Sequence, residues 1–282
     1  VIGQVMKQIN ADLFVLTEVA EDGALDDVVK ILGKAKVGQY SCAYGKTGSQ
    51  QRVAMMWDRD WVRTKKDPAE LFADRDLTVI AEDGRKGDVF PRLPFWGYFE
   101  GIPDDPKSEG FTFELTGVHL KSQMPPRGFS GGRFGIKQRT EAATMLADWL
   151  TTPDQHYDED ILIVGDWNAA PGLEEWKPMR DLEKKGEARF EKINPGNEIT
   201  HVARLNKSGP AGTRLDFHLI SKAADAQAVP KEKGVVIQWK IFDQLSDLDG
   251  TLRKALYTQM RNMVSDHLAV VTRFYFTNAG PK

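Results

Sequence analysis

A short apolar run that ends in a glycine and two polar side chains constrains this chain more than any other feature. Residues 161–164 read Ile-Leu-Ile-Val, and Gly165-Asp166-Trp167-Asn168 follow directly. The run is too short to span a bilayer and is mostly β-branched, so it predicts a buried strand. Because the glycine ends this strand, Asp166 and Asn168 are expected at its carboxyl end, where ligands of layered α/β proteins gather.

The two polar residues form a chemically specific pair. Asp166 offers a carboxylate and Asn168 a carboxamide, two positions apart. Such a pair can hold a hard divalent cation close to a water molecule or a phosphate oxygen. The pattern therefore indicates metal-assisted chemistry on a phosphodiester.

The composition limits the class of protein. The chain has 282 residues, of which 41% are hydrophobic and 28% charged, as in ordinary globular domains. Its single cysteine, Cys42, excludes an intramolecular disulfide and a cysteine-rich zinc site. A net charge of −3 argues against a protein that coats nucleic acid nonspecifically, but not against an enzyme with local charge clusters. No apolar stretch is long enough to span a membrane, so we expect no stable membrane insertion.

Predicted helices and strands alternate along the whole chain. Helical spacing is present in residues 1–10, 24–35, 136–150, 173–185 and 249–263, and strand patterns are present in residues 13–19, 52–57, 77–81, 111–120, 161–164, 214–221, 235–239 and 268–276. Residues 83–106 are expected to hold turns and short strands, and residues 123–133 a loop. No repeat or linker divides the chain, which predicts one α/β domain over residues 1–282.

An acid, an amide or a histidine stands at the end of five predicted strands. These residues are Glu18, His119, the pair Asp166 and Asn168, Asp216, and the pair Asp266 and His267. Each position alone is more typical of a solvated rim residue, a cap or a structural histidine. Their joint occurrence favours a shared site.

The same positions carry a resemblance to a known family. The motifs occur in the order Thr17-Glu18-Val19, Gly117-Val118-His119-Leu120, Gly165-Asp166-Trp167-Asn168, Arg214-Leu215-Asp216-Phe217 and Ser265-Asp266-His267-Leu268. This series resembles that of the endonuclease/exonuclease/phosphatase superfamily, the group similar to deoxyribonuclease I and exonuclease III. The resemblance implies a four-layered α/β sandwich of two packed mixed β-sheets flanked by helices, with the active site at one edge. It also implies a first strand that ends in asparagine. The sequence opens at the helix that should follow this strand, so we expect the strand to be missing here, with either a truncated sequence or another segment in its place as the explanation.

The resemblance further implies roles in a metal site. Glu18 and Asp266 would ligate a divalent cation, Mg²⁺ or Mn²⁺. Asp166 would orient or deprotonate the attacking water, and Asn168 would hydrogen-bond the scissile phosphate or that water. These roles match what phosphodiester hydrolysis requires, namely an in-line nucleophile and relief of charge at phosphorus.

Two histidines complete the implied machinery. His267 would contact the phosphate and transfer a proton, with Asp216 or Asp266 orienting its ring. His119 would supply a second proton donor or a hydrogen bond to the transition state. A carboxylate beside a histidine favours the imidazolium and fixes the orientation of the ring.

The sequence favours DNA as the substrate, with RNA as an alternative. Lys121, Arg127, Arg133 and Arg139 follow His119 in and after a glycine-rich segment, as in a group of bacterial DNA-degrading nucleases that this segment resembles. A solvated surface loop explains the same composition equally well. A phosphoesterase of lipid headgroups or small phosphate esters and an inactive binding module of the same fold remain alternatives. No protein partner is indicated, and we expect a monomer.

Overall fold

The computed structural model describes residues 2–32, 39–82, 84–103, 107, 110–123, 133–190, 198–230, 232, 235–237, 248–263 and 265–274. Its helices are α1 (Ile2–Ile9), α2 (Asp26–Leu32), α3 (Arg133–Leu150), α4 (Lys177–Lys185), α5 (Lys222–Gln227) and α7 (Gly250–Met263). Its strands are β1 (Leu13–Val19), β2 (Tyr40–Tyr44), β3 (Arg52–Asp58), β4 (Val62–Glu70), β5 (Thr78–Ile80), β6 (Lys86–Asp88), β7 (Phe95–Gly101), β8 (Phe111–His119), β9 (Ile161–Asp166), β10 (Ala188–Arg189), β11 (His201–Asn206), β12 (Gly209–Thr213), β13 (Asp216–Ser221), β14 (Val235–Val236) and β15 (Val270–Val271).

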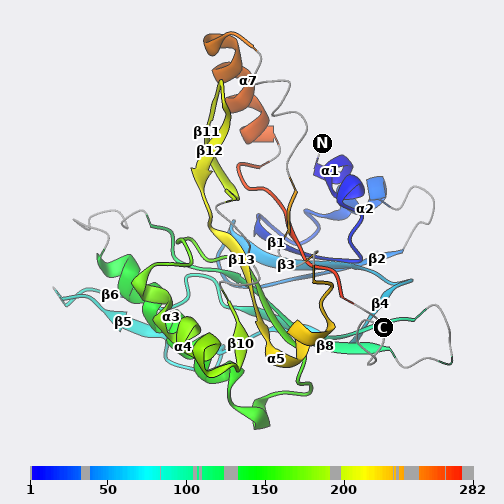
Figure 1. The fold of residues 1–282 in the computed structure, drawn as a ribbon, viewed down its shortest axis with the longest axis vertical. Coiled ribbons are helices and arrows are strands. Elements are labelled where there is room, and N and C mark those ends of the chain that lie inside the picture. The colour runs from blue at the N-terminus through cyan, green and yellow to red at the C-terminus, as the bar shows by residue number, and fades with distance from the viewer. Residues whose placement is uncertain are drawn as a thin grey trace.

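Two packed sheets form the centre of the fold (Figure 1). The large sheet has the strand order β10-β13-β9-β8-β7-β4, in which β8 and β9 run parallel and the other neighbours antiparallel. The small sheet has the order β1-β3-β2 and is antiparallel. Helices α3 and α4 cover the outer side of the large sheet, and α1 and α2 cover that of the small sheet. The predicted four-layered sandwich is confirmed.

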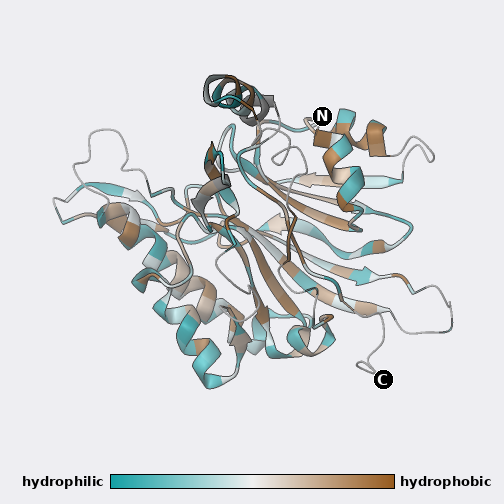
Figure 2. Ribbon diagram, turned by 45° about the horizontal axis from the view of Figure 1, so that its top comes forward, coloured by the Kyte–Doolittle hydropathy of each residue, from teal (hydrophilic) through white to brown (hydrophobic). Residues whose placement is uncertain are grey.

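Alternating side chains of the strands fill the three spaces between these layers. On β9, Ile161 and Ile163 join the core under α3 and α4, whereas Leu162 and Val164 point into the core between the sheets. Because both faces of β9 are buried, its sequence is continuously apolar instead of alternating with polar residues. Figure 2 shows this burial as hydrophobic strands inside the molecule and hydrophilic helix surfaces outside.

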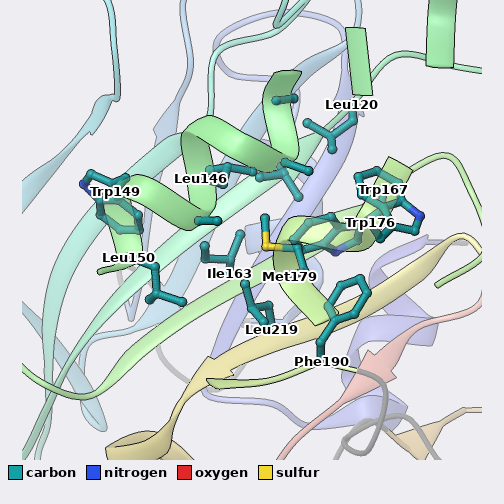
Figure 3. Packing of buried hydrophobic residues seen from close by; sticks show 14 of the residues in the cluster. Leu120, Leu146, Trp149, Leu150, Ile163, Trp167, Trp176, Met179, Phe190 and Leu219 are labelled. Carbon is teal, nitrogen blue, oxygen red and sulfur yellow. The ribbon is translucent and has the colours of Figure 1, made fainter. Parts of the chain in front are cut away.

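An aromatic group lies under the strand ends that carry the polar motifs (Figure 3). Trp167 is fully buried, stacks on Phe217 with ring centroids 4.9 Å apart, and meets the edge of Trp176. Its indole nitrogen donates to the carbonyl oxygen of Phe217 at 2.9 Å. The tryptophan between Asp166 and Asn168 is therefore an anchor that holds the two polar residues against the core.

Most predicted elements are present, and the differences have physical causes. In the described part of the strand expected over residues 268–276, namely 268–274, the structure has only β15 and an isolated bridge between Ala228 and Phe274, and residues 275–276 lie outside the described residues. Residues 83–106 contain β7, a long core strand, because its aromatic residues pack between the sheets. Residues 124–132 of the expected loop lie outside the described residues. Within the described part of the chain β1 pairs on one side only, and the implied absence of a preceding strand stays a prediction.

None of the helices in the described residues is both long and apolar enough to cross a membrane.

A buried ion pair ties the strands to the segment after α3. Glu114 on β8 is completely buried and accepts hydrogen bonds from the indole of Trp96, from His156 and from the backbone of the segment beyond it. His156 donates through Nδ1 to Glu114 at 3.1 Å and through Nε2 to the carbonyl oxygen of Trp149 at 2.7 Å. Because both partners only accept, both ring nitrogens carry hydrogen and the imidazole is charged.

The pKa shifts of the pair agree with this assignment. Burial alone would lower the pKa of His156, but its hydrogen bonds to Glu114 and to Trp149 outweigh burial and raise it. Burial would raise the pKa of Glu114, but the hydrogen bonds from His156, Tyr157 and Trp96 lower it. The stabilisation from the pair is lost as the pH rises through the pKa of His156 and as it falls through that of Glu114.

The substitution Glu114→Gln should lower the free energy of unfolding by about 3 kcal/mol or more, because it leaves a buried imidazolium without its counterion. Urea unfolding should show the largest difference from the wild type between pH 4.5 and pH 6.5, the pKa values that glutamate and histidine have in an unfolded chain. The difference should shrink at higher pH. Asp181→Asn, which removes an exposed pair with Lys177, is the matched control and should unfold at nearly the same urea concentration as the wild type. Equal, pH-independent losses in both variants would contradict the ion pair.

Candidate active site

Three neighbouring strands of the large sheet bring three of the predicted residues side by side. His119 at the end of β8 is the pairing partner of Asp166 at the end of β9. Asp166 in turn pairs with Asp216 at the start of the antiparallel β13. Neighbouring strands lie about 4.8 Å apart, so the pairing alone places the three side chains in one row at the sheet edge.

Local backbone geometry explains the glycine before Asp166. Gly165 has a φ of 136°, and a Cβ atom at this position would lie 2.2 Å from the carbonyl oxygen of Val118. Only glycine permits this close approach to β8. Beyond it, the amide of Trp167 donates to the carbonyl oxygen of Leu215 at 2.9 Å, which fixes how β9 leaves the sheet.

Asp166 and Asn168 form a rigid unit. The carboxylate of Asp166 accepts from the backbone amide and from the side-chain amide of Asn168, both at 2.8 Å. The second amide hydrogen of Asn168 goes to the carbonyl oxygen of Leu120 at 3.0 Å. With both donors in use, Asn168 can face a ligand only through its carbonyl oxygen. That oxygen accepts from water or binds a cation, so the geometry favours the water role over direct donation to phosphate.

Asp216 and His267 form a hydrogen-bonded pair. Nδ1 of His267 lies 2.7 Å from Oδ2 of Asp216, and ligand atoms of Asp166, Asp216 and His267 lie within 4.8 Å of one another. Burial would lower the pKa of His267, but the negative charges of Asp216, Asp166 and Asp266 raise it. The structure therefore favours an imidazolium at position 267, oriented by Asp216.

Burial acts on the pKa of Asp166 in the opposite direction to its action on His267. Burial, followed by the charge of Asp216, raises the pKa of this carboxyl group, and His267 and Asn168 only partly offset the rise. A carboxylate with an elevated pKa is a better proton acceptor near neutral pH than an ordinary surface aspartate.

The site also contains a buried arginine that no sequence pattern predicted. Arg92 is 7% exposed, and its Nη2 atom lies 3.2 Å from Nε2 of His119 and hydrogen-bonds Gln51. Gln51 in turn donates to Glu18 at 3.2 Å. The only sequence signal for Arg92 is its place between two prolines just before β7, and Gln51 has none.

His119 is neutral in this environment. Its burial and the positive charges of Arg92 and His267 lower its pKa to about 3. Because a guanidinium only donates, Nε2 of His119 acts as the acceptor and the proton is assigned to Nδ1. Nε2 also lies 3.5 Å from Oδ2 of Asp166 and 4.0 Å from Oε1 of Glu18, so the neutral ring lies between these two carboxylates.

The two expected metal ligands, Glu18 and Asp266, lie beside different residues of the site. Glu18 stands next to His119, with a side chain 58% exposed and a φ of 60°. Oδ2 of Asp266 lies 3.5 Å from Nε2 of His201, and these two residues and His267 form a second group of close ligand atoms. Among the described residues, Glu18 is in neither group.

The donor set nonetheless fits a hard divalent cation. Carboxylate oxygens dominate it, which suits Mg²⁺ or Mn²⁺ better than a soft metal. Burial raises the pKa of Asp166 most, and the charge of Asp216 adds to the rise, so a bound cation would favour the charged form of this carboxylate.

The predicted substrate-binding residues differ in position. Arg133 is exposed at the start of α3, and Lys121 is half-buried close to Arg92. Arg127 lies outside the described residues. Arg139 is 3% exposed, pairs with Glu175 at 2.8 Å and donates to the carbonyl oxygen of Lys121. Its guanidinium thus has no surface for a substrate, contrary to the prediction, because α3 turns this face toward the core.

Thr200 connects the two halves of the site. Its hydroxyl is buried and accepts from the backbone amides of Leu215 and Asp216, each at 2.9 Å. Its carbonyl oxygen accepts from the amide of Leu268 at 2.7 Å. One residue thereby positions both Asp216 and the strand segment after His267, and its spacing in the sequence gives no sign of this.

Comparison with solved structures identifies the fold. Similar structures include an endonuclease/exonuclease/phosphatase family protein of Bacteroides thetaiotaomicron, with 17% identity and a TM-score of 0.53 over 79% of this chain and 72% of that chain. A mannosyl-6-phosphatase of the same organism has 14% identity and a TM-score of 0.54 over 98% and 89% of the two chains. Truncated TDP2 of Caenorhabditis elegans has 16% identity and a TM-score of 0.52 over 97% and 88%.

The chain therefore has the fold of endonuclease/exonuclease/phosphatase proteins, as the motif series implied. No family model matches the sequence, and no curated protein matches it either.

The substitution Thr200→Val should lower the free energy of unfolding by about 2 kcal/mol or more, because two buried amides lose their acceptor without a change in side-chain shape. Urea denaturation checks this value. Thr200→Ser, which keeps the hydroxyl, is the matched control and should cost about 1 kcal/mol. If valine is tolerated as well as serine, Thr200 does not hold the site together.

Proposed function

We propose that this protein is a divalent-metal-dependent phosphodiesterase and that its substrate is DNA. One observation carries the proposal: Asp166, Asp216 and His267, from three separate segments, bring their ligand atoms within 4.8 Å of one another, with His119 paired next to Asp166. A cluster of two carboxylates and a charged imidazole, of which Asp166 is buried and the other two are half-buried, is costly to fold and is typical of a reactive site.

In this proposal the chain's own residues divide the proton transfers. Asp166 orients and deprotonates the attacking water, and the carbonyl oxygen of Asn168 accepts a hydrogen bond from the same water. The imidazolium of His267 binds the phosphate and gives its proton to the leaving oxygen, while Asp216 keeps the ring in place. Each such proton-transfer group contributes roughly 10²–10⁴-fold to a rate.

His119 and Arg92 act on the other side of Asp166. The neutral ring of His119 is held by Arg92, whose positive charge lies near Asp166 and Glu18. A fixed guanidinium in a buried site stabilises negative charge that develops on phosphate oxygens. We therefore assign Arg92 to the stabilisation of the transition state, with His119 as its partner.

Glu18 and Asp266 would hold the divalent cation, Mg²⁺ or Mn²⁺, as the carboxylates of the two flanking segments. When bound, the cation neutralises charge on a non-bridging phosphate oxygen and orients the phosphate.

DNA is favoured over RNA by the likeness of residues 119–139 to bacterial DNA-degrading nucleases. The exposed Arg133 and the half-buried Lys121 supply positive charge that suits the phosphate backbone of either nucleic acid. The fold also hosts a protein named as a mannosyl-6-phosphatase, so a small phosphate ester is the second candidate. We further propose that residues 1–282 form one monomeric domain.

A supercoiled-plasmid assay tests the proposal. The protein should nick the plasmid with Mg²⁺ or Mn²⁺ and lose this activity in excess chelator. RNA, a phosphodiester reporter and sugar phosphates assayed in parallel distinguish the substrates. Full activity in chelator would contradict the metal dependence, and hydrolysis of sugar phosphates alone would replace DNA with the second candidate.

The substitutions Asp166→Asn and His267→Ala should each lower kcat for plasmid nicking by about 10² or more, with smaller changes in KM, because each removes a proton-transfer group. Glu18→Ala should instead raise the metal concentration required for half-maximal activity. Near-normal kcat in His267→Ala would refute its role, provided that circular dichroism shows an intact fold.

A further inference from the structure

A hairpin and a helix project from the sandwich beside His267. Strands β11 and β12 form the hairpin, and α7 packs against it at the top of Figure 1. A small core of its own joins the two: Val202, Leu205, Val236, Tyr257 and Leu268 are buried together. We call residues 201–213 and 250–263 the projecting unit.

The projecting unit is attached directly to the catalytic segment. His201 and His267 form an isolated antiparallel bridge, and their ring centroids lie 5.0 Å apart. The amide of Val202 donates to the carbonyl oxygen of Asp266 at 2.7 Å. The unit therefore has a fixed position relative to His267, and anything bound along the hairpin lies next to the reacting group.

The charge of this unit differs from that of the rest of the chain. Its sequence contains Arg204, Lys207, Arg253, Lys254 and Arg261 but no aspartate or glutamate, whereas the whole chain has a net charge of −3. Asp249 just before α7 is used as a cap, since it accepts from the amide of Thr251 at 2.9 Å. A local positive field beside an acidic catalytic centre attracts a polyanion.

The cations of the hairpin face solvent. Val202 and Leu205 are buried on the side of α7, and the hydroxyl of Tyr257 donates to the carbonyl oxygen of Val202. A register shift in β11 lies between Val202 and Arg204. Beyond it, Arg204 and Lys207 are exposed. The packing against α7 thus orders the strand while its positive side chains stay available.

We infer that the projecting unit is a nucleic-acid-binding arm, in which Arg204 and Lys207 contact backbone phosphates that flank the phosphate at His267. This inference rests on the proposed function and adds a second binding site to it. From His201 to Lys207, in the turn just after β11, the extended chain spans at most about 20 Å at about 3.3 Å per residue. That length corresponds to about six nucleotide steps of 3.4 Å each.

An anionic membrane is a less suitable partner for the same charge. Binding to a lipid surface needs apolar or aromatic side chains beside the cations. Among the hairpin positions whose burial is described, Ala203, Arg204, Lys207, Ser208, Gly212 and Thr213 are exposed, and none of them is a large apolar residue. On α7, Leu252 is 49% exposed, and it is the one exposed large apolar residue in the described part of the helix.

Fluorescence anisotropy tests the arm without turnover. A labelled 20-nucleotide DNA strand is titrated with the full chain in chelator at several salt concentrations. The double variant Arg204→Glu with Lys207→Glu should bind about tenfold more weakly, and its salt slope should fall by about 0.7 per lost phosphate contact. The matched control, Lys184→Glu with Lys185→Glu, reverses two exposed charges at the end of α4 and should bind like the wild type.

A cleavage assay separates the arm from the chemistry. Plasmid nicking by the hairpin variant should show a KM about tenfold higher, whereas hydrolysis of bis(p-nitrophenyl) phosphate should change less than about twofold, because that small ester does not reach the hairpin. If the wild type cleaves neither substrate, the proposed function fails. If it cleaves both and the hairpin variant matches the α4 control, only the arm is refuted.

Vesicles that contain phosphatidylserine provide the remaining comparison. Cosedimentation that depends on Arg204 and Lys207, with DNA affinity unchanged in the variant, would overturn the inference in favour of a membrane contact. Absence of vesicle binding together with the tenfold loss of DNA affinity supports it.

Discussion

The pairing of β8, β9 and β13 is the constraint on which the site depends. Strand register alone sets His119, Asp166 and Asp216 side by side, and a one-residue slip of any of the three strands would turn its own residue away from the other two. Gly165 permits the close contact with β8, and the buried Trp167 fixes the exit of the strand. The apolar run and the polar motif are thus one structural device, since the strand's burial on both faces enforces the geometry of its end.

The charges of the site compensate one another only in part. Asp216 and His267 neutralise each other in part, while burial and the nearby charge of Asp216 raise the pKa of Asp166. Burial, together with the positive charge of Arg92 beside it, keeps the ring of His119 neutral. The site therefore places a neutral and a charged histidine on either side of one proton acceptor, an asymmetry that suits a reaction in which one proton is removed and another delivered.

Local patterns make much of this predictable. Residues 13–19 form β1 as expected, and β8 ends at His119, because strand propensity and burial agree there. The prediction for Arg139 is wrong because a charged residue on a helix is usually solvated, and only the packing of Glu175 against α3 shows otherwise. Arg92, Thr200 and His201 act through contacts with distant segments, and no spacing along the chain encodes such contacts.

Glu18, Asp166 and Asp266 are proposed to enclose one cation-binding centre. Anomalous diffraction from crystals grown with Mn²⁺ tests it most directly. The account predicts one strong peak within about 2.4 Å of carboxylate oxygens that include Glu18 or Asp266, beside Asp166. A peak at another place on the molecule, or no peak with these carboxylates ordered, would contradict it.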